Sequence, residues 1–137
     1  MKTTTAFSHT YTRIALTALS LFFYTAATQA QTKAQLKDSL KVATDRLEYA
    51  PDSVDLRLKK ASLNLQLEQW SYALDEYDLI LKYNPYNLAA LFYRAYTNEK
   101  LHRYKFARLD YENLLTIVPG HFEGQLGLAL LNQKDKH

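Results

Sequence analysis

The sequence repeats with a period of 34 residues, and this period limits the possible folds more than any other property of the chain. Its three prolines, Pro51, Pro85 and Pro119, are each 34 residues apart. The same shift superimposes Leu88–His121 on Val54–Asn87. A fixed period of 20 to 50 residues is typical of proteins built from stacked structural repeats, in which each unit buries its apolar face against the next. The chain is therefore expected to be a repeat protein.

The positions that agree between the two copies are small, aromatic or apolar. The matching pairs are Trp70 with Tyr104, Ala73 with Ala107, Tyr77 with Tyr111 and Leu81 with Leu115. Two further sets share one phase of the period, namely Ala61, Ala95 and Ala129, and Asn64, Asn98 and Asn132. No segment alternates apolar and polar residues over a useful length, so no sheet is expected.

All of the predicted elements are helices. Their ranges are Thr32–Tyr49, Val54–Leu67, Trp70–Tyr83, Leu88–Leu101, Tyr104–Ile117 and Phe122–Lys134. Apolar residues recur within them at spacings of three and four, as in a helix that buries one face. Each proline stops a helix, because the residue before Pro is pushed out of helical geometry. Asp52 or Ser53 and then Asn87 are expected to cap the helices that follow them.

These helices group into repeats. The expected domain covers residues 31–137, with a half repeat at 32–51, full repeats at 54–87 and 88–121, and a half repeat at 122–137. A stack of this kind needs about three repeats to be stable. Either the half repeats act as caps, or the chain is a fragment of a longer solenoid. The apolar last helix, which stops where a partner helix should begin, favours the fragment.

Residues 1–30 have the pattern of a secretory signal peptide. Lys2 and Arg13 flank the first segment without an acid, the apolar run Ile14–Ala27 follows, and Thr28–Ala30 places small residues at the cleavage site. Cleavage is expected after Ala30. The alternative is an uncleaved anchor, but the run has 14 residues, whereas spanning a bilayer takes about 20. We therefore expect an exported protein, periplasmic or secreted, without stable membrane insertion after cleavage.

Charge and composition exclude several other classes of protein. Lys2 and Arg13 are the only charged residues among 1–30, so the rest carries 15 Lys and Arg against 14 Asp and Glu, a net charge of +1. These charges alternate in sign, as on a solvated helix face. The one local basic cluster, His102–Arg108, is smaller than a nucleic-acid footprint. No nucleic-acid partner is expected.

The chain also lacks the residue patterns of an enzyme. It has no cysteine, which excludes thiol chemistry and a lipid-modified signal. It has no Gly-x-Ser-x-Gly turn. His102, His121 and His137 include no pair with the i, i+4 spacing of a zinc site, and the glycines are not spaced as a phosphate loop. We expect no catalytic residues, no metal and no cofactor.

In a helical hairpin, residues equally far from the turn face each other. This places Ala61 against Ala73 and Ala95 against Ala107, so that the helix axes approach closely while Trp70, Tyr77, Tyr104 and Tyr111 fill the surrounding space. It also places Lys60 opposite Glu76 and Arg94 opposite Asp110. We predict one ion pair in each hairpin, worth about 1 kcal/mol or less if exposed. The recurring asparagines are expected to have a packing role, because Asn is a poor interior helix residue.

The pattern resembles the tetratricopeptide repeat (TPR) family. The residues that carry the resemblance are Ala61, Trp70, Ala73, Tyr77, Leu81 and Pro85, then Tyr93–Ala95, Leu101, Tyr104, Ala107, Asp110–Tyr111, Leu115 and Pro119. The chain departs from the family on the first helix, where Trp or Leu and Tyr are usual. Arg57, Lys60, Asn64, Arg94 and Asn98 stand there instead. The resemblance implies an all-α solenoid of antiparallel helix hairpins, wound as a right-handed superhelix.

The resemblance also implies that the first helices line a concave groove for a peptide or protein partner. Mapped onto this chain, the groove residues are Leu58, Ser62, Leu65, Phe92, Tyr96, Glu99, Leu126, Leu130 and Gln133. Some TPR grooves clamp a partner's C-terminal carboxylate with Lys, Arg and Asn, but these positions are mostly apolar or aromatic. They suit a helix or extended segment with hydrophobic anchors. Alternatively, Phe92 and Tyr96 pack against a neighbouring repeat.

Two functions remain open from the sequence. The first is a protein–protein interaction module or scaffold that binds a peptide or protein partner in the cell envelope. The second is a structural spacer within a longer solenoid, with no ligand of its own. An exposed apolar patch along the groove would favour binding, because such patches mark interaction sites.

Overall fold

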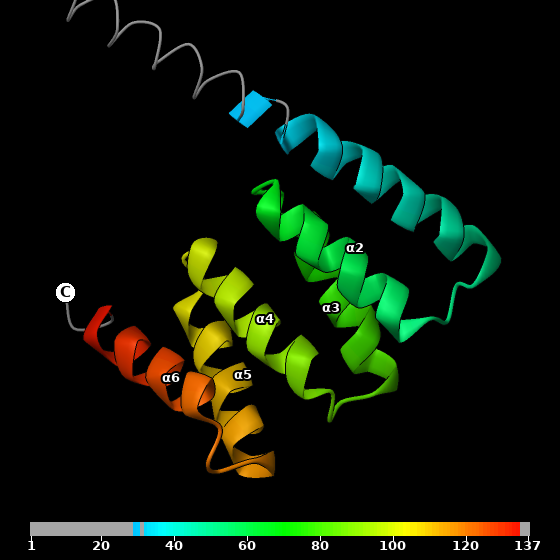
Figure 1. Ribbon diagram of the computed structural model, residues 1–137. Coiled ribbons are helices and arrows are strands. Elements are labelled where there is room, and N and C mark those ends of the chain that lie inside the picture. The colour runs from blue at the N-terminus through cyan, green and yellow to red at the C-terminus, as the bar shows by residue number, and fades with distance from the viewer. Residues whose placement is uncertain (1–28, 31, 135–137) are drawn as a thin grey trace, which may run out of the picture. The chain divides into compact units, whose positions relative to one another are not determined.

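The computed structural model describes residues 29–30 and 32–134, and every element in this part of the chain is a helix (Figure 1). Residues 32–49 are helical. The helices that follow are α2 (Val54–Gln66), α3 (Trp70–Tyr83), α4 (Leu88–Lys100), α5 (Tyr104–Ile117) and α6 (Phe122–Lys134). The predicted all-α fold is confirmed. Helices α2 and α4 end one residue earlier than predicted, because Leu67 and Leu101 are their C-caps.

Two units are defined by their internal contacts. The larger one, Leu36–His137, contains all the helices from residue 36 onward, and only residues 29–30 and 32–35 of Met1–Gln35 are described. The predicted signal peptide therefore lies outside the described residues except for 29 and 30, as does the end of the last half repeat at 135–137. None of the described helices is long and apolar enough to cross a membrane.

The predicted N-caps are present in both full repeats. The Ser53 hydroxyl accepts a hydrogen bond from the backbone N–H of Leu56 at 3.3 Å, and the Asn87 side chain accepts one from Ala90 at 2.9 Å. Each of these bonds satisfies a backbone donor that the first turn of a helix leaves free. The two caps are 34 residues apart, so the repeats begin in the same way.

The hairpin turns also repeat. Glu68 and His102 both adopt the left-handed conformation, with φ of 58° and 57°. In each turn, the N–H of the next residue donates to the carbonyl oxygen of Asn64 or Asn98 at 2.8 Å. The left-handed conformation favours glycine because it has no Cβ. Two non-glycine residues therefore hold an unfavourable backbone conformation at equivalent places.

The helices form a stack of antiparallel hairpins. Helix α2 packs against α3 and α4 against α5, while α3 contacts α4, and α6 contacts both α5 and α4. Ala43 and Leu47 of the helix over residues 36–49 are also buried. Each helix therefore buries its apolar face mainly against its neighbours in sequence, as expected of a solenoid.

The predicted core contacts are largely confirmed. The alanines that face each other across the two hairpins, Ala61, Ala73, Ala95 and Ala107, are all 0% exposed. Tyr77 and Tyr111 are buried beside them, whereas Trp70 and Tyr104 are only half-buried. Asn64 and Asn98 are buried as predicted, but Asn132 is exposed on α6. The packing role therefore holds for the asparagines of the two complete hairpins.

Candidate functional site

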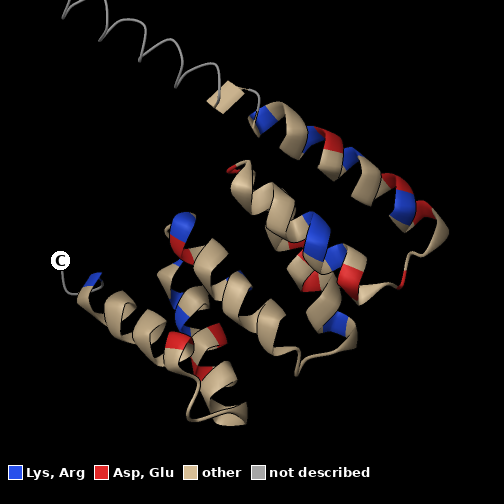
Figure 2. Ribbon diagram, in the orientation of Figure 1, with Lys and Arg blue, Asp and Glu red and all other residues tan. Residues whose placement is uncertain are grey.

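The predicted groove residues lie on the first helices of the repeats, α2, α4 and α6. On α2, Leu58 and Leu65 are half-buried and pack against the core, while Ser62 is exposed. On α6, Leu126 and Leu130 expose 48% and 46% of their surface. Figure 2 shows that α6 carries charge only near its two ends. The α6 part of the predicted groove is therefore an exposed apolar strip.

Phe92 of α4 has a packing role. Its ring centroid lies 5.2 Å from that of Tyr93, 6.0 Å from Tyr111 and 6.0 Å from His121. Phe92 also packs against both buried clusters of the core. These contacts favour the alternative interpretation of this residue, in which it packs against other helices, over a free groove contact.

Tyr96 is the aromatic residue of the predicted groove that stays open to solvent, with 37% of its surface exposed. The Lys100 ammonium lies 5.1 Å from the centre of its ring and 5.9 Å from the ring of Trp70. Cations at this distance are attracted to the face of an aromatic ring. The contact with Lys100 restrains the Tyr96 side chain, and part of its ring stays exposed to solvent.

Glu99 is bound by residues of two other helices. Its carboxylate, 10% exposed, accepts a hydrogen bond from the Tyr111 hydroxyl at 2.8 Å and pairs with the Lys134 ammonium at 2.8 Å. Burial raises the pKa of Tyr111, and the bond to Glu99 raises it further. The bond to Glu99 also raises the pKa of Lys134. Glu99 therefore links α4, α5 and α6 and is not a free groove contact.

A pocket of about 320 Å³ opens beside Phe92. It is lined by Leu88, Ala89, Phe92, Tyr93, His121 and Glu123. Two of its walls are aromatic, and the ring of His121 stacks on that of Phe92. His121 itself is held by the backbone N–H of Gly124, which donates to its Nδ1 at 3.2 Å. The pocket is thus a preformed, mainly apolar hollow next to a predicted groove residue.

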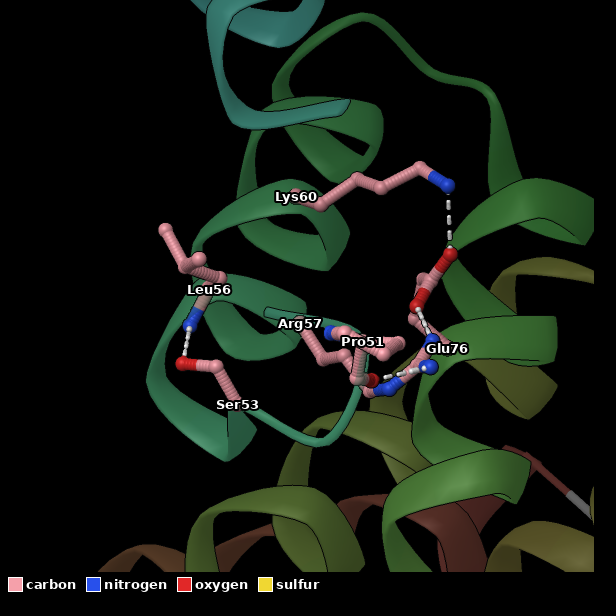
Figure 3. A network of polar contacts seen from close by, with 6 residues as sticks. All are labelled: Pro51, Ser53, Leu56, Arg57, Lys60 and Glu76. Atoms are coloured by element: carbon pink, nitrogen blue, oxygen red, sulfur yellow. Dashed lines mark hydrogen bonds and ion pairs between the residues drawn. The ribbon is translucent and has the colours of Figure 1, made fainter. Parts of the chain in front are cut away.

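The predicted ion pair of the first hairpin is confirmed (Figure 3). The Lys60 ammonium lies 2.6 Å from one oxygen of Glu76, and Arg57 donates to the other oxygen at 2.9 Å. Arg57 also donates to the carbonyl oxygen of Pro51 at 2.6 Å. The Glu76 side chain is only 7% exposed. The sequence predicted the contact but not the burial of its carboxylate.

The predicted ion pair of the second hairpin is confirmed as well. Arg94 donates to both oxygens of Asp110, at 2.8 and 2.6 Å, and the Asp110 side chain is 2% exposed. A third bond joins Arg94 to Asp78 of the preceding repeat at 2.8 Å. The bond to Asp110 is the main cause that raises the pKa of Arg94. The contact with Asp78 was not predicted from the sequence, although Arg94 is 16 residues from both carboxylates.

Both ion pairs lie in equivalent clefts that were not predicted from the sequence. The first cleft, of about 450 Å³, is lined by Leu40, Thr44, Lys60, Asn64, Gln69, Tyr72, Asp75 and Glu76. The second, of about 270 Å³, is lined by Leu74, Asp78, Arg94, Asn98, Arg103, Phe106, Leu109 and Asp110. Every residue of the second is 34 positions beyond a residue of the first. A comparison of the two repeats position by position would have found them.

The charged groups deepest in these clefts already satisfy one another, so the clefts are better explained as joints between helices than as ligand sites. Within the described part of the chain, no group of three His, Asp or Glu residues is placed to hold a metal ion. Of the apolar residues of the predicted groove, Tyr96, Leu126 and Leu130 stay exposed, and a pocket opens beside Phe92.

Solved structures with a similar arrangement of helices include TPR domains. No protein-family model and no curated protein matches the chain. Among solved structures, the first TPR domain of Spaghetti (RPAP3), bound to the HSP90 peptide SRMEEVD, matches with a TM-score of 0.72 and 21% identity, over 77% of this chain and 84% of that one. The Arabidopsis OM64 TPR domain matches with a TM-score of 0.69 and 19% identity, over 77% and 87%.

A bacterial structure is similar over a smaller share of its length. A tetratricopeptide repeat protein from Parabacteroides merdae matches with a TM-score of 0.71 and 25% identity, over 75% of this chain and 40% of that one. Together these likenesses show that the chain has the TPR fold, an all-α solenoid of helix hairpins.

Proposed function

We propose that this chain is a protein–protein interaction module that holds a peptide or protein partner along the groove of its first helices. The observation that carries this proposal is the exposure of three apolar residues of the predicted groove, Tyr96 on α4 and Leu126 and Leu130 on α6, which together are called the apolar strip. The first TPR domain of Spaghetti has the same fold and is bound to a peptide. A rigid solenoid that exposes such a strip is suited to binding apolar anchors.

The chemistry of the strip defines the ligand class. A clamp for a terminal carboxylate needs cationic or amide side chains, whereas Leu58, Ser62, Tyr96 and Leu130 supply no cation. Glu99 is already paired with Lys134. The proposed ligand is therefore a helix or extended segment that places apolar side chains on the strip and in the pocket beside Phe92. The HSP90 peptide SRMEEVD, with its acidic end, is not expected to bind.

We further propose that the module works outside the cytoplasm, in the cell envelope. The support for this is the pattern of residues 1–30, with its charged start, its apolar run and small residues before Gln31. The intact mass of the protein recovered from cells tests this part directly. A mature N-terminus at Gln31 supports export, and an intact Met1 in the exported fraction contradicts cleavage.

A peptide-display selection tests the binding proposal. Peptides enriched on the wild-type protein are synthesised, and their affinity is measured by fluorescence anisotropy beside SRMEEVD. Tyr96→Ala and Leu130→Ala should each weaken binding about tenfold, the effect of about 1.4 kcal/mol. Phe106→Ala is the matched control, because Phe106 is 63% exposed on α5 and lines the second cleft.

Three results would contradict the proposal. These are a selection that enriches no peptide, equal losses in Phe106→Ala and the groove variants, or binding of SRMEEVD with the enriched peptides unbound. The alternative function, a spacer without a ligand, is favoured by one specific observation. Phe92 and Glu99, two of the predicted groove residues, are committed to contacts between helices.

A further inference from the structure

Helix α6 has the sequence phase of a first helix but has no second helix packed against it in the described chain. In the complete hairpins, Ala61 and Ala95 are 0% exposed, because each faces an alanine of its partner helix. Ala129 occupies the same position on α6 and is exposed. Asn132 is exposed too, unlike Asn64 and Asn98, although its side-chain oxygen accepts a hydrogen bond from Arg108 of α5. The hairpin face of α6 is therefore open at Ala129.

The helix over residues 36–49 has the opposite phase. It corresponds to the second helix of a repeat, and Ser39 occupies the position of the fully buried Ala73 and Ala107. Ser39 is exposed, and Val42 three residues later exposes 48% of its surface. This helix therefore also presents an open hairpin face, with a small residue at the point of closest approach.

Both open faces have an apolar residue where the complete hairpins have a member of the ion pair. In the complete hairpins the first helix supplies a cation there, Lys60 or Arg94, and the second an anion, Glu76 or Asp110. Helix α6 has Leu128 at the cation position, where it is half-buried and packs in part against the core cluster that contains Tyr111. The helix over residues 36–49 has the exposed Val42 at the anion position. An apolar residue on each side makes the faces complementary to each other.

We propose that α6 of one molecule docks against the helix over residues 36–49 of a second copy and completes a hairpin between the two molecules. Ala129 lies against Ser39, and Leu128 against Val42. The contact joins two different surfaces, so it leaves one open face at each end of the dimer. Such heterologous contacts propagate head to tail into longer assemblies.

The substitutions also explain why a second copy would use this helix and not another. The corresponding faces of α3 and α5 are already packed against α2 and α4. If one of these hairpins opened and its second helix docked on α6, Glu76 or Asp110 would leave its cation and lie against Leu128. A buried carboxylate without a partner is strongly disfavoured. A single helix pair buries less surface than a standard stable interface. The assembly is therefore expected to be weak and to depend on concentration.

The test measures molar mass by sedimentation and light scattering over a range of concentrations. The full chain is expressed, recovered from the cells, and its N-terminus is read by mass spectrometry. The mass is expected to rise with concentration from that of a monomer. Ala129→Arg and Ser39→Arg should each abolish this rise, and both residues are exposed, so circular dichroism should stay unchanged. Asn113→Arg, on the exposed surface of α5, is the matched control.

Mixing the two blocked variants separates a head-to-tail contact from other association. Ala129→Arg keeps its helix over residues 36–49 intact, and Ser39→Arg keeps α6 intact. Their mixture should form a one-to-one dimer and nothing larger. Species larger than this dimer, or no dimer at all, would overturn the proposal.

A charge exchange provides a second arm that does not depend on arginine. Val42→Glu and Leu128→Lys should each weaken association, and the double variant should restore it by recreating the pair found in the first hairpin. A wild-type protein that stays monomeric up to about millimolar concentration overturns the proposal. Association that survives unchanged in all these variants does so as well.

Discussion

The contact between Arg94 and Asp110 offers the sharpest test of how the hairpins are stabilised. Arg94 binds both oxygens of a carboxylate that is 2% exposed, and it keeps a third bond to Asp78. Removing one partner of a buried pair costs about 3–5 kcal/mol. Because Arg94 is 24% exposed and retains Asp78, we expect Asp110→Ala to cost about 3 kcal/mol, at the lower end of that range.

The assay is a double-mutant cycle with Arg94→Ala and Asp110→Ala, measured by urea unfolding. The expected coupling energy is about 2 kcal/mol, within the range for contacting charged residues. The matched control is Lys41 with Asp45, which are 2.7 Å apart but 76% and 53% exposed. That pair should show no coupling beyond experimental error. The comparison isolates burial, because the distances are alike.

A coupling energy between Arg94 and Asp110 no larger than that of the exposed pair would contradict this prediction. A change in the urea m-value would also invalidate it, because the slope reports altered compactness rather than a lost contact. The cycle is informative because a domain of this size is stable by about 5–15 kcal/mol. A loss of 3 kcal/mol from that total leaves a measurable folded state.

Three further predictions concern the repeats themselves. Gly127→Ala should destabilise the fold by about 1–3 kcal/mol, because its Cβ would lie 2.6 Å from Cζ of the buried Tyr111, whereas Gly120→Ala meets no atom within 4 Å; thermal unfolding of both variants checks this. Glu68→Gly should stabilise by about 0.5–1 kcal/mol in urea unfolding, because glycine relieves the left-handed strain. The folded-state pKa of Tyr111 is raised above its ordinary value of 10, so its contribution to stability is complete below pH 10 and is lost above it. The loss is about 1.4 kcal/mol per pH unit, and Tyr111→Phe should reduce the alkaline slope of the stability profile, to which the buried Tyr77 with its raised pKa also contributes.

The repeat architecture was predictable because the period, the prolines and the small residues all report the same helix boundaries. Ser53 and Asn87 marked the helix starts by residue type alone. The left-handed turns at Glu68 and His102 were not predictable. That conformation is usually predicted from a glycine in the sequence, and neither residue is glycine.

The sequence predicted which helix face carries the groove residues, but it did not predict the contacts that these residues make with other helices. The period assigned Phe92 and Glu99 to the groove side of α4, but it carries no information about what other helices place next to them. Tyr111 and Lys134 reach those residues from α5 and α6. Opposition across the hairpin predicted Arg94 with Asp110 correctly. The contact with Asp78 depends on the stacking of one repeat on the next.

The residues at the ion-pair position affect both the stability of a hairpin and the proposed contact between two molecules. Replacing a buried ion pair by well-packed apolar residues is often neutral or stabilising. We therefore expect Arg94→Met combined with Asp110→Leu to fold within about 1 kcal/mol of the wild type, although Asp110→Ala alone is costly. Urea unfolding of the double variant decides this point.

The same exchange is present naturally in Leu128 and Val42, one on each open helix face. A stable apolar variant of the second hairpin would show that such a pair can replace the charges where the helices are covalently joined. The open faces of α6 and of the helix over residues 36–49 would then be expected to pack against each other without a covalent link, when a second molecule is present at sufficient concentration. If the double variant unfolds, the apolar pair does not substitute for the ion pair, and the complementarity of Leu128 and Val42 loses its energetic basis.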